Sequence, residues 1–517
     1  MIKNFKWLFL VSLTFIACNN DDEVTTKPNS SDGLPLTAGS ADFSKYVALG
    51  NSLTAGFSDN ALFIEGQKGA YTNILAQQFA QVGGGEFKTP FMNDNIGGLL
   101  LGGFQIQGPR LYFNGAAPVP VAGTPSTEVT TKLTGSFNNL GVPGAKSYHL
   151  LAAGYGNPAG VALGQANPYY VRFSSSATSK VIDDATSQNP TFFSLWIGNN
   201  DVLSYATSGG TGVNQTGNPN PATYGANDIT DPAAFAGVYN TLVNSLTANG
   251  AKGVVANIPY VTSVPFFTTV PTNPIPGLPA ASAGQLNALF GGINSALTGA
   301  SLPTRFVTLV ADDGNPATVE ANPLLIRDES LINISSQITT ALTPVVGPTT
   351  AAYLGSIYGQ ARHASGAAAS RDYVLLTART IIGTIQAGAP SPFNTVGVSY
   401  PMQDNTILTA AETAEVKTAT DAYNATISSV ATSKGLAFVD ANAALVQVAS
   451  TGISNGGFTV TSAFVTGGGF SLDGVHPSPR GYALIANKFL QAINFKYGSN
   501  FKDVDFGNYR ILFPSML

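Results

Sequence analysis

Two kinds of hydrophobic pattern alternate along most of the chain. Short apolar runs are typical of buried parallel strands, and apolar residues recurring about every 3.6 positions are typical of helices with one buried face. The runs predict five core strands, at Tyr46–Leu49, Phe137–Leu140, Thr191–Ile197, Gly253–Ile258 and Leu436–Asp440. The helical pattern predicts helices at Tyr71–Val82, at Phe235–Leu246, from Thr409 to about Ser433 and from Arg480 to about Tyr497. This alternation predicts an α/β fold with a five-stranded parallel sheet and helices on both faces.

Two long stretches fall outside this alternation and are predicted to be insertions. Residues from about 83 to 136 are rich in glycine, proline and threonine, and residues from about 260 to 408 carry loops punctuated by proline. Long loops inside a domain are uncommon, and they often serve as lids or binding loops. Both insertions are therefore candidates for shaping a functional site.

The N-terminus has the features of a targeting segment. Lys3 and Lys6 precede an apolar run, Trp7–Ala17, which has the length of a signal peptide and is too short to span a bilayer as a helix. Cys18 follows directly and is the only cysteine of the chain. This junction resembles a bacterial lipoprotein box, which implies removal of residues 1–17 and acylation of Cys18. A plain secretory signal with an incidental cysteine is the alternative.

Residues 18–42 are predicted to be a lipidated, flexible tether, because they are polar and rich in threonine, serine, proline and glycine. The acidic triplet Asp21-Asp22-Glu23 lies close to Cys18 and resembles the surface-export signal of some Gram-negative lipoproteins, although it also suits a simple soluble linker. We therefore expect an outer-membrane lipoprotein, attached through its lipid anchor and either exposed at the cell surface or facing inward.

Composition and charge narrow the range of partners. The 517-residue chain is 44% hydrophobic, only 10% charged, and carries a net charge of −5 with no basic run. Nucleic-acid binding requires a clustered positive surface, so a nucleic-acid partner is excluded. One cysteine and three scattered histidines offer no metal-ligand cluster, and no phosphate-binding glycine motif is present, so neither a metal nor another cofactor is predicted. The weak charge favours a neutral or apolar small-molecule or lipid substrate.

The candidate chemistry centres on a serine at the end of the first predicted strand. Ser52 follows the Tyr46–Leu49 strand in a Gly-Asn-Ser turn, at the sheet edge where ligands bind in open α/β folds. A serine hydroxyl needs a base that is itself oriented by a third group. His476 lies three residues after Asp473, a spacing that lets one turn present both side chains. Of the other two histidines, His149 is expected to be packed or to cap a helix at the surface. His363 is expected to be solvated.

Four sequence blocks occur in an order that is similar to that of the SGNH (GDSL-like) hydrolases. They are Gly50-Asn51-Ser52, Asn139-Leu140-Gly141-Val142-Pro143-Gly144, Gly198-Asn199-Asn200-Asp201 and Asp473-Gly474-Val475-His476. The resemblance covers about half of the chain beyond the signal segment and excludes the two insertions. It implies a three-layer, flavodoxin-like domain over residues 43–517.

The resemblance also implies roles for particular residues. Ser52, Asp473 and His476 would be catalytic, and the oxyanion hole would be formed by the backbone N–H groups of Ser52 and Gly144 and by the side-chain amide of Asn200. The family's usual Gly-Asp-Ser is Gly-Asn-Ser in this chain. Asparagine can make similar hydrogen bonds to the surrounding loop but carries no charge.

The motifs leave several functions open. The first is a serine carboxylester hydrolase of the esterase or lipase type that forms an acyl-enzyme on Ser52. The second is an acetyl esterase or O-acyltransferase that acts on acylated glycans, and the third is a non-catalytic surface binding lipoprotein. Because the second insertion leaves the sheet edge that carries Ser52, we expect it to wall an acyl pocket. The expected lining groups are the apolar residues of Pro259-Tyr260-Val261 and Val264-Pro265-Phe266-Phe267. The alternative is that these aromatic residues pack an accessory subdomain remote from the site.

Overall fold

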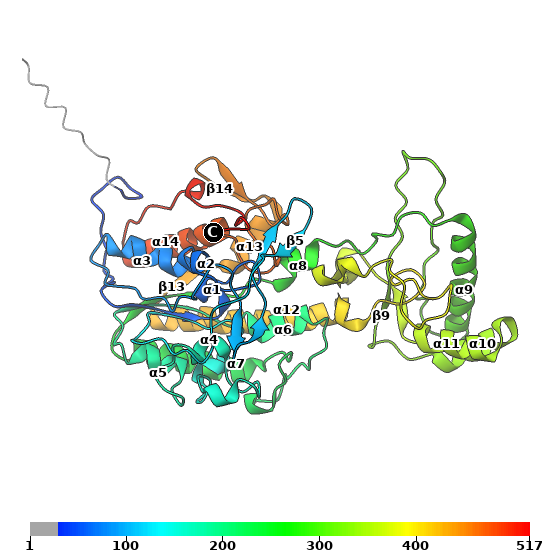
Figure 1. Ribbon diagram of the computed structural model, residues 1–517, viewed down its shortest axis with the longest axis horizontal. Coiled ribbons are helices and arrows are strands. Elements are labelled where there is room, and N and C mark those ends of the chain that lie inside the picture. The colour runs from blue at the N-terminus through cyan, green and yellow to red at the C-terminus, as the bar shows by residue number, and fades with distance from the viewer. Residues whose placement is uncertain (1–28) are drawn as a thin grey trace, which may run out of the picture.

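The computed structural model describes residues 29–517, which form a body around a parallel sheet and a smaller lobe projecting from one end (Figure 1). The sheet strands are β1 (Tyr46–Gly50), β6 (Asn139–Gly141), β7 (Phe192–Trp196), β8 (Lys252–Ala256) and β13 (Ala437–Val439). All neighbours are parallel, and the spatial order is β13-β8-β7-β1-β6. Numbered along the chain, this is the order 2-1-3-4-5 of a doubly wound sheet, whose chain reverses direction across β1. The predicted α/β fold with a five-stranded parallel sheet is confirmed.

The strands are buried on both faces, which explains their continuous apolar sequences. Every residue of β1 and β7 is buried. Helices α3 and α14 cover one face of the sheet, and α5, α7 and α12 cover the other (Figure 1). Their bounds are α3 (Tyr71–Ala80), α5 (Val181–Thr186), α7 (Pro232–Thr247), α12 (Ala410–Lys434) and α14 (Pro479–Tyr497). The predicted helices agree with the observed ones to within a few residues.

The segment before β1 lies against the C-terminal part of the chain. Ser31 N–H donates to Asn500 O at 2.9 Å, and Ser40 N–H donates to Tyr497 O at 2.8 Å. Phe43 then stacks on Phe79 in the core, with ring centroids 4.0 Å apart. The predicted tether therefore does not extend to residue 42, because the chain is attached to the body from Ser31 onward. The polar composition of this segment did not indicate the attachment, because the hydrogen bonds of Ser31 and Ser40 are made by backbone groups, which every residue type carries.

The predicted signal peptide (1–17), Cys18 and the acidic triplet all lie outside the described residues. Within residues 29–517, no helix combines the length and the apolar character needed to cross a membrane.

The first insertion folds onto the body. It forms two small hairpins, and its buried residues Met92, Leu99 and Val129 share an apolar cluster with Ala55 and Phe57, three and five residues after Ser52. The hairpin strands are β2 (Leu99–Leu101), β3 (Phe104–Gln107), β4 (Leu111–Phe113) and β5 (Pro118–Pro120). This insertion is thus part of the wall behind the nucleophile turn.

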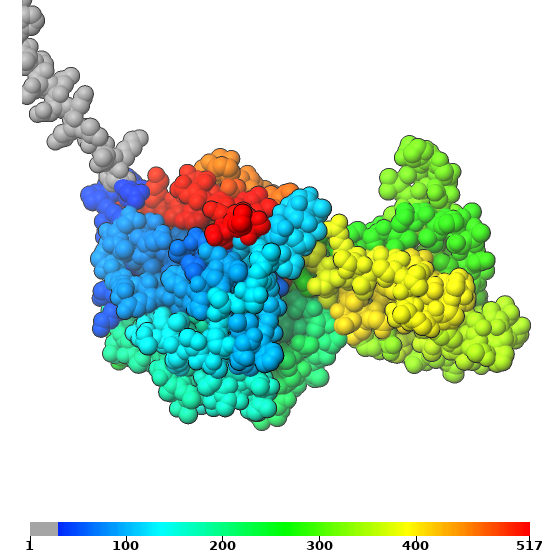
Figure 2. Space-filling view, viewed as in Figure 1, coloured from blue at the N-terminus to red at the C-terminus, as the bar shows by residue number. Residues whose placement is uncertain are grey.

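The second insertion builds the projecting lobe, which stands apart from the body in the space-filling view (Figure 2). Its larger apolar cluster is centred on residues such as Phe290, Ile338 and Tyr358, and a second cluster includes Leu324 and Met402. The lobe's main elements are α9 (Ala280–Gly299), β9 (Leu325–Arg327), α10 (Ser335–Val346), α11 (Pro348–Tyr358) and β10 (Ala361–His363). It therefore has cores of its own, separate from the core around the sheet.

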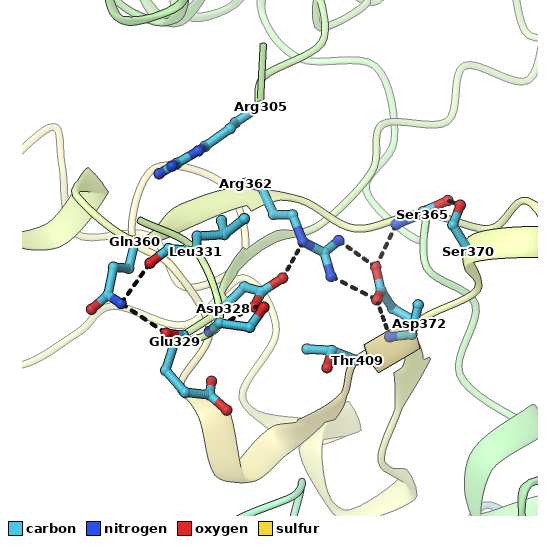
Figure 3. A network of polar contacts seen from close by, with 12 residues as sticks. Arg305, Asp328, Glu329, Leu331, Gln360, Arg362, Ser365, Ser370, Asp372 and Thr409 are labelled. Carbon is cyan, nitrogen blue, oxygen red and sulfur yellow. Dashed lines mark hydrogen bonds and ion pairs between the residues drawn. The ribbon is translucent and has the colours of Figure 1, made fainter. Parts of the chain in front are cut away.

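A buried ion-pair network ties the lobe to the body (Figure 3). Arg362, on β10, contacts Asp328 at 2.6 Å and binds both carboxylate oxygens of Asp372, at 2.6 and 2.8 Å. Asp372 also accepts hydrogen bonds from Ser365 N–H and from the N–H of Ala410, the first residue of α12. Because every partner is satisfied, the network fixes how the lobe meets α12.

Candidate active site

Ser52 lies where β1 turns into the short helix α1 (Ser52–Ala55). Asn51 precedes it as the helix N-cap, and its side-chain oxygen accepts a hydrogen bond from Leu53 N–H at 3.0 Å. The Asn51 amide also donates to Asn199 Oδ1 at 3.2 Å. An aspartate could make the first bond but, when ionised, not the second. Asparagine at position 51 can therefore donate a hydrogen bond to its buried neighbour Asn199. Ser52, which follows it in the turn, is only 6% exposed.

The structure brings Ser52, His476 and Asp473 into one hydrogen-bonded chain. Ser52 Oγ lies 2.9 Å from His476 Nε2, and His476 Nδ1 lies 2.8 Å from Asp473 Oδ2. With Nδ1 protonated, the imidazole donates to the carboxylate and leaves Nε2 to accept the serine proton. The histidine ring is also held by Phe57, whose ring centroid lies 4.6 Å away. This is the geometry in which a serine hydroxyl becomes an effective nucleophile.

The Asp473 carboxylate is held by more than the imidazole. Its Oδ1 accepts the N–H groups of Val475 and His476, both at 2.8 Å. Burial by itself would raise the Asp473 pKa, but His476 and these N–H donors outweigh burial and lower it. The residue therefore stays ionised and can stabilise an imidazolium.

A turn in residues 58–60 supports the acid from behind, and sequence reasoning missed it. Asn60 N–H donates to Asp473 Oδ2 at 3.0 Å, and Asp59 Oδ1 accepts Leu472 N–H at 2.9 Å. Asp59 and Asn60 both have positive φ, 50° and 65°. Asparagine and aspartate tolerate this region better than most residues, so the Asp-Asn pair was the available signal. Burial raises the pKa of Asp59 to about 7, although Leu472 N–H opposes the shift.

The three predicted oxyanion-hole donors lie on neighbouring segments of the sheet edge. Asn200, the first residue of α6 (Asn200–Thr207), lines the same cavity as Ser52 and His476. The loop that carries Gly144 is tied to the nucleophile strand, because Val142 N–H donates to Gly50 O at 2.9 Å. Gly144 has φ +80°, which explains the glycine. Within residues 29–517, the N–H groups of Ser52 and Gly144 have no protein acceptor.

Asn200 and Asp201 also hold the Gly144 loop in place. One amide hydrogen of Asn200 is donated to Ala145 O at 2.9 Å, which leaves its second amide hydrogen for another acceptor. The buried carboxylate of Asp201 accepts Ser147 N–H and Ser147 Oγ–H, at 2.8 and 2.7 Å. The Gly-Asn-Asn-Asp block therefore positions a donor and fixes the loop that carries another.

An apolar cavity of about 120 Å³ opens beside Ser52. Its polar lining is concentrated at the catalytic end, where Asn51, Ser52, Asn199, Asn200 and His476 lie. Its apolar lining comes from the ends of β7 and β13, the segment after β8, and helices α13 (Ala441–Ser450) and α14. The arrangement places the Ser52 hydroxyl, the His476 imidazole and the Asn200 amide together at one end of a hydrophobic space.

The other two histidines lie outside this site. His149 is packed, with Nδ1 accepting Lys146 N–H and its ring stacked 4.6 Å from Tyr155. The expectation that His363 is solvated is wrong. It is 6% exposed, burial lowers its pKa to about 4, and its Nδ1 accepts Val307 N–H inside the lobe. The lobe core encloses it, which the sequence of a loop-rich insertion does not indicate.

The predicted acyl-pocket residues of the second insertion are only partly right. Val261 and Val264 line the cavity, but Phe266 and Phe267 do not. Phe266 instead packs behind the acid turn, where its N–H donates to Gly474 O at 2.9 Å. The chain forms the short helix α8 (Pro265–Thr268) at this point, and the helix turns both rings away from the cavity and into the core.

Two groups of carboxylates within residues 29–517 are close enough to hold a metal ion. They are Asp312, Asp313 and Glu320, and Glu329, Asp404 and Glu412. None of these residues lines the cavity beside Ser52.

No protein-family model, characterised protein or solved structure matches this chain. The geometry of the site is therefore the basis on which a function can be proposed.

Proposed function

We propose that the protein is a serine carboxylester hydrolase of the SGNH type. The observation that carries the proposal is the continuous hydrogen-bonded chain from Ser52 through His476 to Asp473, at the mouth of an apolar cavity. The 2-1-3-4-5 strand order supports the finer assignment to a flavodoxin-like domain, because it is the order of that fold. A pure binding protein would have no use for the complete chain of groups.

In the first half of the reaction, Ser52 Oγ attacks the ester carbonyl carbon while its proton passes to His476 Nε2. The carbonyl oxygen becomes an oxyanion that the N–H groups of Ser52 and Gly144 and the Asn200 amide can stabilise. The tetrahedral intermediate then collapses, its bond to the alcohol oxygen breaks, and the alcohol leaves with the proton from Nε2. An acyl-serine remains.

In the second half, water attacks the acyl-serine and gives a proton to His476 Nε2. Collapse of the second tetrahedral intermediate releases the carboxylic acid and returns the proton to Ser52 Oγ. Asp473 stays ionised throughout and stabilises the imidazolium that forms twice in each cycle. A sugar hydroxyl in place of water would give acyl transfer, so product analysis with a sugar acceptor present separates the two activities.

The test of the proposal is Ser52→Ala, assayed on p-nitrophenyl esters. We expect kcat to fall by roughly 10⁴-fold or more with the thermal midpoint unchanged, and His476→Ala to cost a similar factor. The double variant should lose little beyond either single one, because the two groups act as a unit. Retention of more than a tenth of the wild-type activity by Ser52→Ala would refute the assignment.

We also propose that the protein is an outer-membrane lipoprotein anchored through Cys18. Two or more acyl chains give stable attachment where a single chain is marginal. Cys18→Ser should move the protein from the membrane fraction to the soluble fraction, with the specific activity on soluble esters unchanged. Persistent membrane association of this variant after a high-salt wash would show that another surface makes the attachment.

A further inference from the structure

We infer that the cavity beside Ser52 is a binding site for an unbranched acyl chain of roughly six to ten carbons. This inference rests on the proposed function for its kinetic part and names the substrate class of the same site. Its basis is the way two helices line the cavity. On α14 the lining positions are Gly481, Leu484, Ile485, Lys488 and Phe489, and on α13 they are Ala441, Ala444, Leu445 and Val448.

Both sets have the spacing of a single helix face, with residues at i, i+3, i+4 and i+7. Such stripes ordinarily pack against each other, whereas here they face each other across open space. The residues at the N-terminal ends of the two stripes, Gly481 and Ala441, are small. On both segments these are the ends closest in sequence to the sheet edge and the catalytic turn. The space is therefore elongated and runs along the helices away from Ser52.

The length of the stripes sets an upper limit for the chain. Gly481 to Phe489 covers about 12 Å of helix, and Ala441 to Val448 about 10 Å, at a rise of ~1.5 Å per residue. A staggered carbon chain with ~1.5 Å bonds and ~111° angles advances about 1.25 Å per carbon. Roughly eight to ten carbons therefore span the lined distance.

The volume favours the shorter end of this range. The cavity holds about 120 Å³, and a closed apolar cavity of roughly 150 Å³ accepts a six-carbon ring such as benzene. A six-carbon chain therefore fills most of the space, and longer chains reach toward the half-buried Lys488 at the far end. An acetyl group would not reach the distal lining residues, so they would make no van der Waals contacts with the substrate.

The polarity of the lining selects against sugars as occupants. Beyond the catalytic end, its side chains are hydrocarbon or aromatic except for Lys488. A sugar ring placed there would bury hydroxyl groups without partners. Each additional methylene of a fatty acyl chain is instead expected to raise kcat/KM about fourfold until the cavity is full.

The kinetic experiment measures kcat/KM for p-nitrophenyl esters from acetate to palmitate. We expect a maximum between hexanoate and decanoate. Ala444→Phe, which places a ring midway along the cavity, should lower the decanoate-to-acetate ratio at least tenfold. Ala449→Phe is the matched control, because residue 449 is exposed on the same helix and does not line the cavity, and its ratio should equal that of the wild type.

A second pair of variants compares Val264, which lines the cavity, with Phe266, which does not. Val264→Phe should shift the preference toward shorter esters, because Val264 lines the cavity. Phe266→Ala should leave the chain-length preference unchanged, because Phe266 does not line the cavity. A flat chain-length profile in the wild type, or an unchanged ratio in both Ala444→Phe and Val264→Phe, would overturn the inference.

A binding experiment keeps this inference distinct from the proposed activity. The chain from Asn19 to Leu517 keeps every described residue and contains one tryptophan, Trp196, which lines the cavity. Titration with decanoate should change its emission saturably in the Ser52→Ala variant, and at least tenfold more weakly once Ala444→Phe is added. Saturable binding without ester turnover would refute the hydrolase and keep the acyl site. Ester turnover without any tryptophan response or chain-length preference would refute the acyl site and keep the hydrolase.

Discussion

The two insertions differ in length and have opposite structural outcomes. The first, of roughly fifty residues, lays its buried residues against Ala55 and Phe57 and becomes part of the body. The second, of roughly 150 residues, encloses apolar clusters of its own and projects as a lobe. Short segments cannot bury enough surface to be stable alone, whereas longer ones can. The greater length of the second insertion therefore allows it to build a core of its own.

The difference extends to the active site. The first insertion holds the turn behind the acid, because Leu111 N–H donates to Asp59 O at 2.8 Å and Gln107 Nε2 donates to Asn60 O at 3.1 Å. Near Gly474, the second insertion reaches the site through Phe266 and Leu376. A Cβ at Gly474 would lie 2.9 Å from Leu376 and 3.1 Å from the backbone nitrogen of Phe266. We therefore expect catalysis to be sensitive to the first insertion and mainly stability to be sensitive to the lobe.

The largest effect should come from the same chemical change made at two carboxylates, one in the site and one in the lobe. Asp473→Asn should lower kcat by roughly 10⁴-fold with little loss of stability, because the amide favours the wrong imidazole tautomer. Steady-state kinetics on p-nitrophenyl hexanoate and a thermal melt measure both quantities.

The matched lobe variant is Asp372→Asn, which removes one of the two ion pairs of the half-buried Arg362. It should cost about 1.5–3 kcal/mol of stability, because Arg362 loses charge-assisted hydrogen bonds but keeps its contact with Asp328, while kcat stays within a few-fold of the wild type. A loss of kcat beyond a hundredfold in the folded Asp372→Asn protein would show that the lobe takes part in the chemistry, and the comparison would fail.

A smaller effect should come from the support turn in residues 58–60. Asn60→Val should lower kcat about tenfold, because a β-branched residue resists the positive φ and displaces the N–H that binds Asp473. Asn60→Gly keeps both the conformation and the N–H, so it should retain nearly full activity. Equal losses in the two variants would instead assign the effect to the lost amide side chain. The readout is kcat for both variants, with a thermal melt of each to confirm that it is folded.

The smallest effect should be a dependence of stability on pH at the junction of lobe and body. The carboxylate oxygens of Glu329, Asp404 and Glu412 lie within 4.8 Å of one another. Burial, with the nearby Glu329, raises the pKa of Asp404 to about 8, and burial also raises that of Glu412 to about 7. The folded protein therefore holds protons that the unfolded chain releases near pH 4–5. The free energy of unfolding should fall as pH rises from about 5 to about 8, by on the order of 1–2 kcal/mol after allowance for partial exposure.

Urea unfolding at several pH values measures this slope. Glu412→Gln should flatten it and stabilise the protein at pH 8, whereas Glu86→Gln, at a mostly exposed carboxylate, should leave it unchanged. Stability that rises with pH over this range in the wild type would contradict the inferred protonation.

The sequence alone determined the strands and the residues at their carboxyl ends. Apolar runs must be buried, and parallel strands align their ends at one edge, so the placement of Ser52 and Asn200 followed from local pattern. The spacing of Asp473 and His476 likewise let one turn present both side chains, as the structure has them.

The tertiary structure alone decided the features that depend on contacts between distant segments. Asn60 meets Asp473 across more than 400 residues of chain, and His363 is buried because a lobe closes around it. The same applies to Phe266, which short-range pattern placed in the cavity and which a single helical turn directs behind the acid. Hydrophobic pattern specifies that a residue is buried but not against what, because burial is non-directional whereas packing requires a particular neighbour.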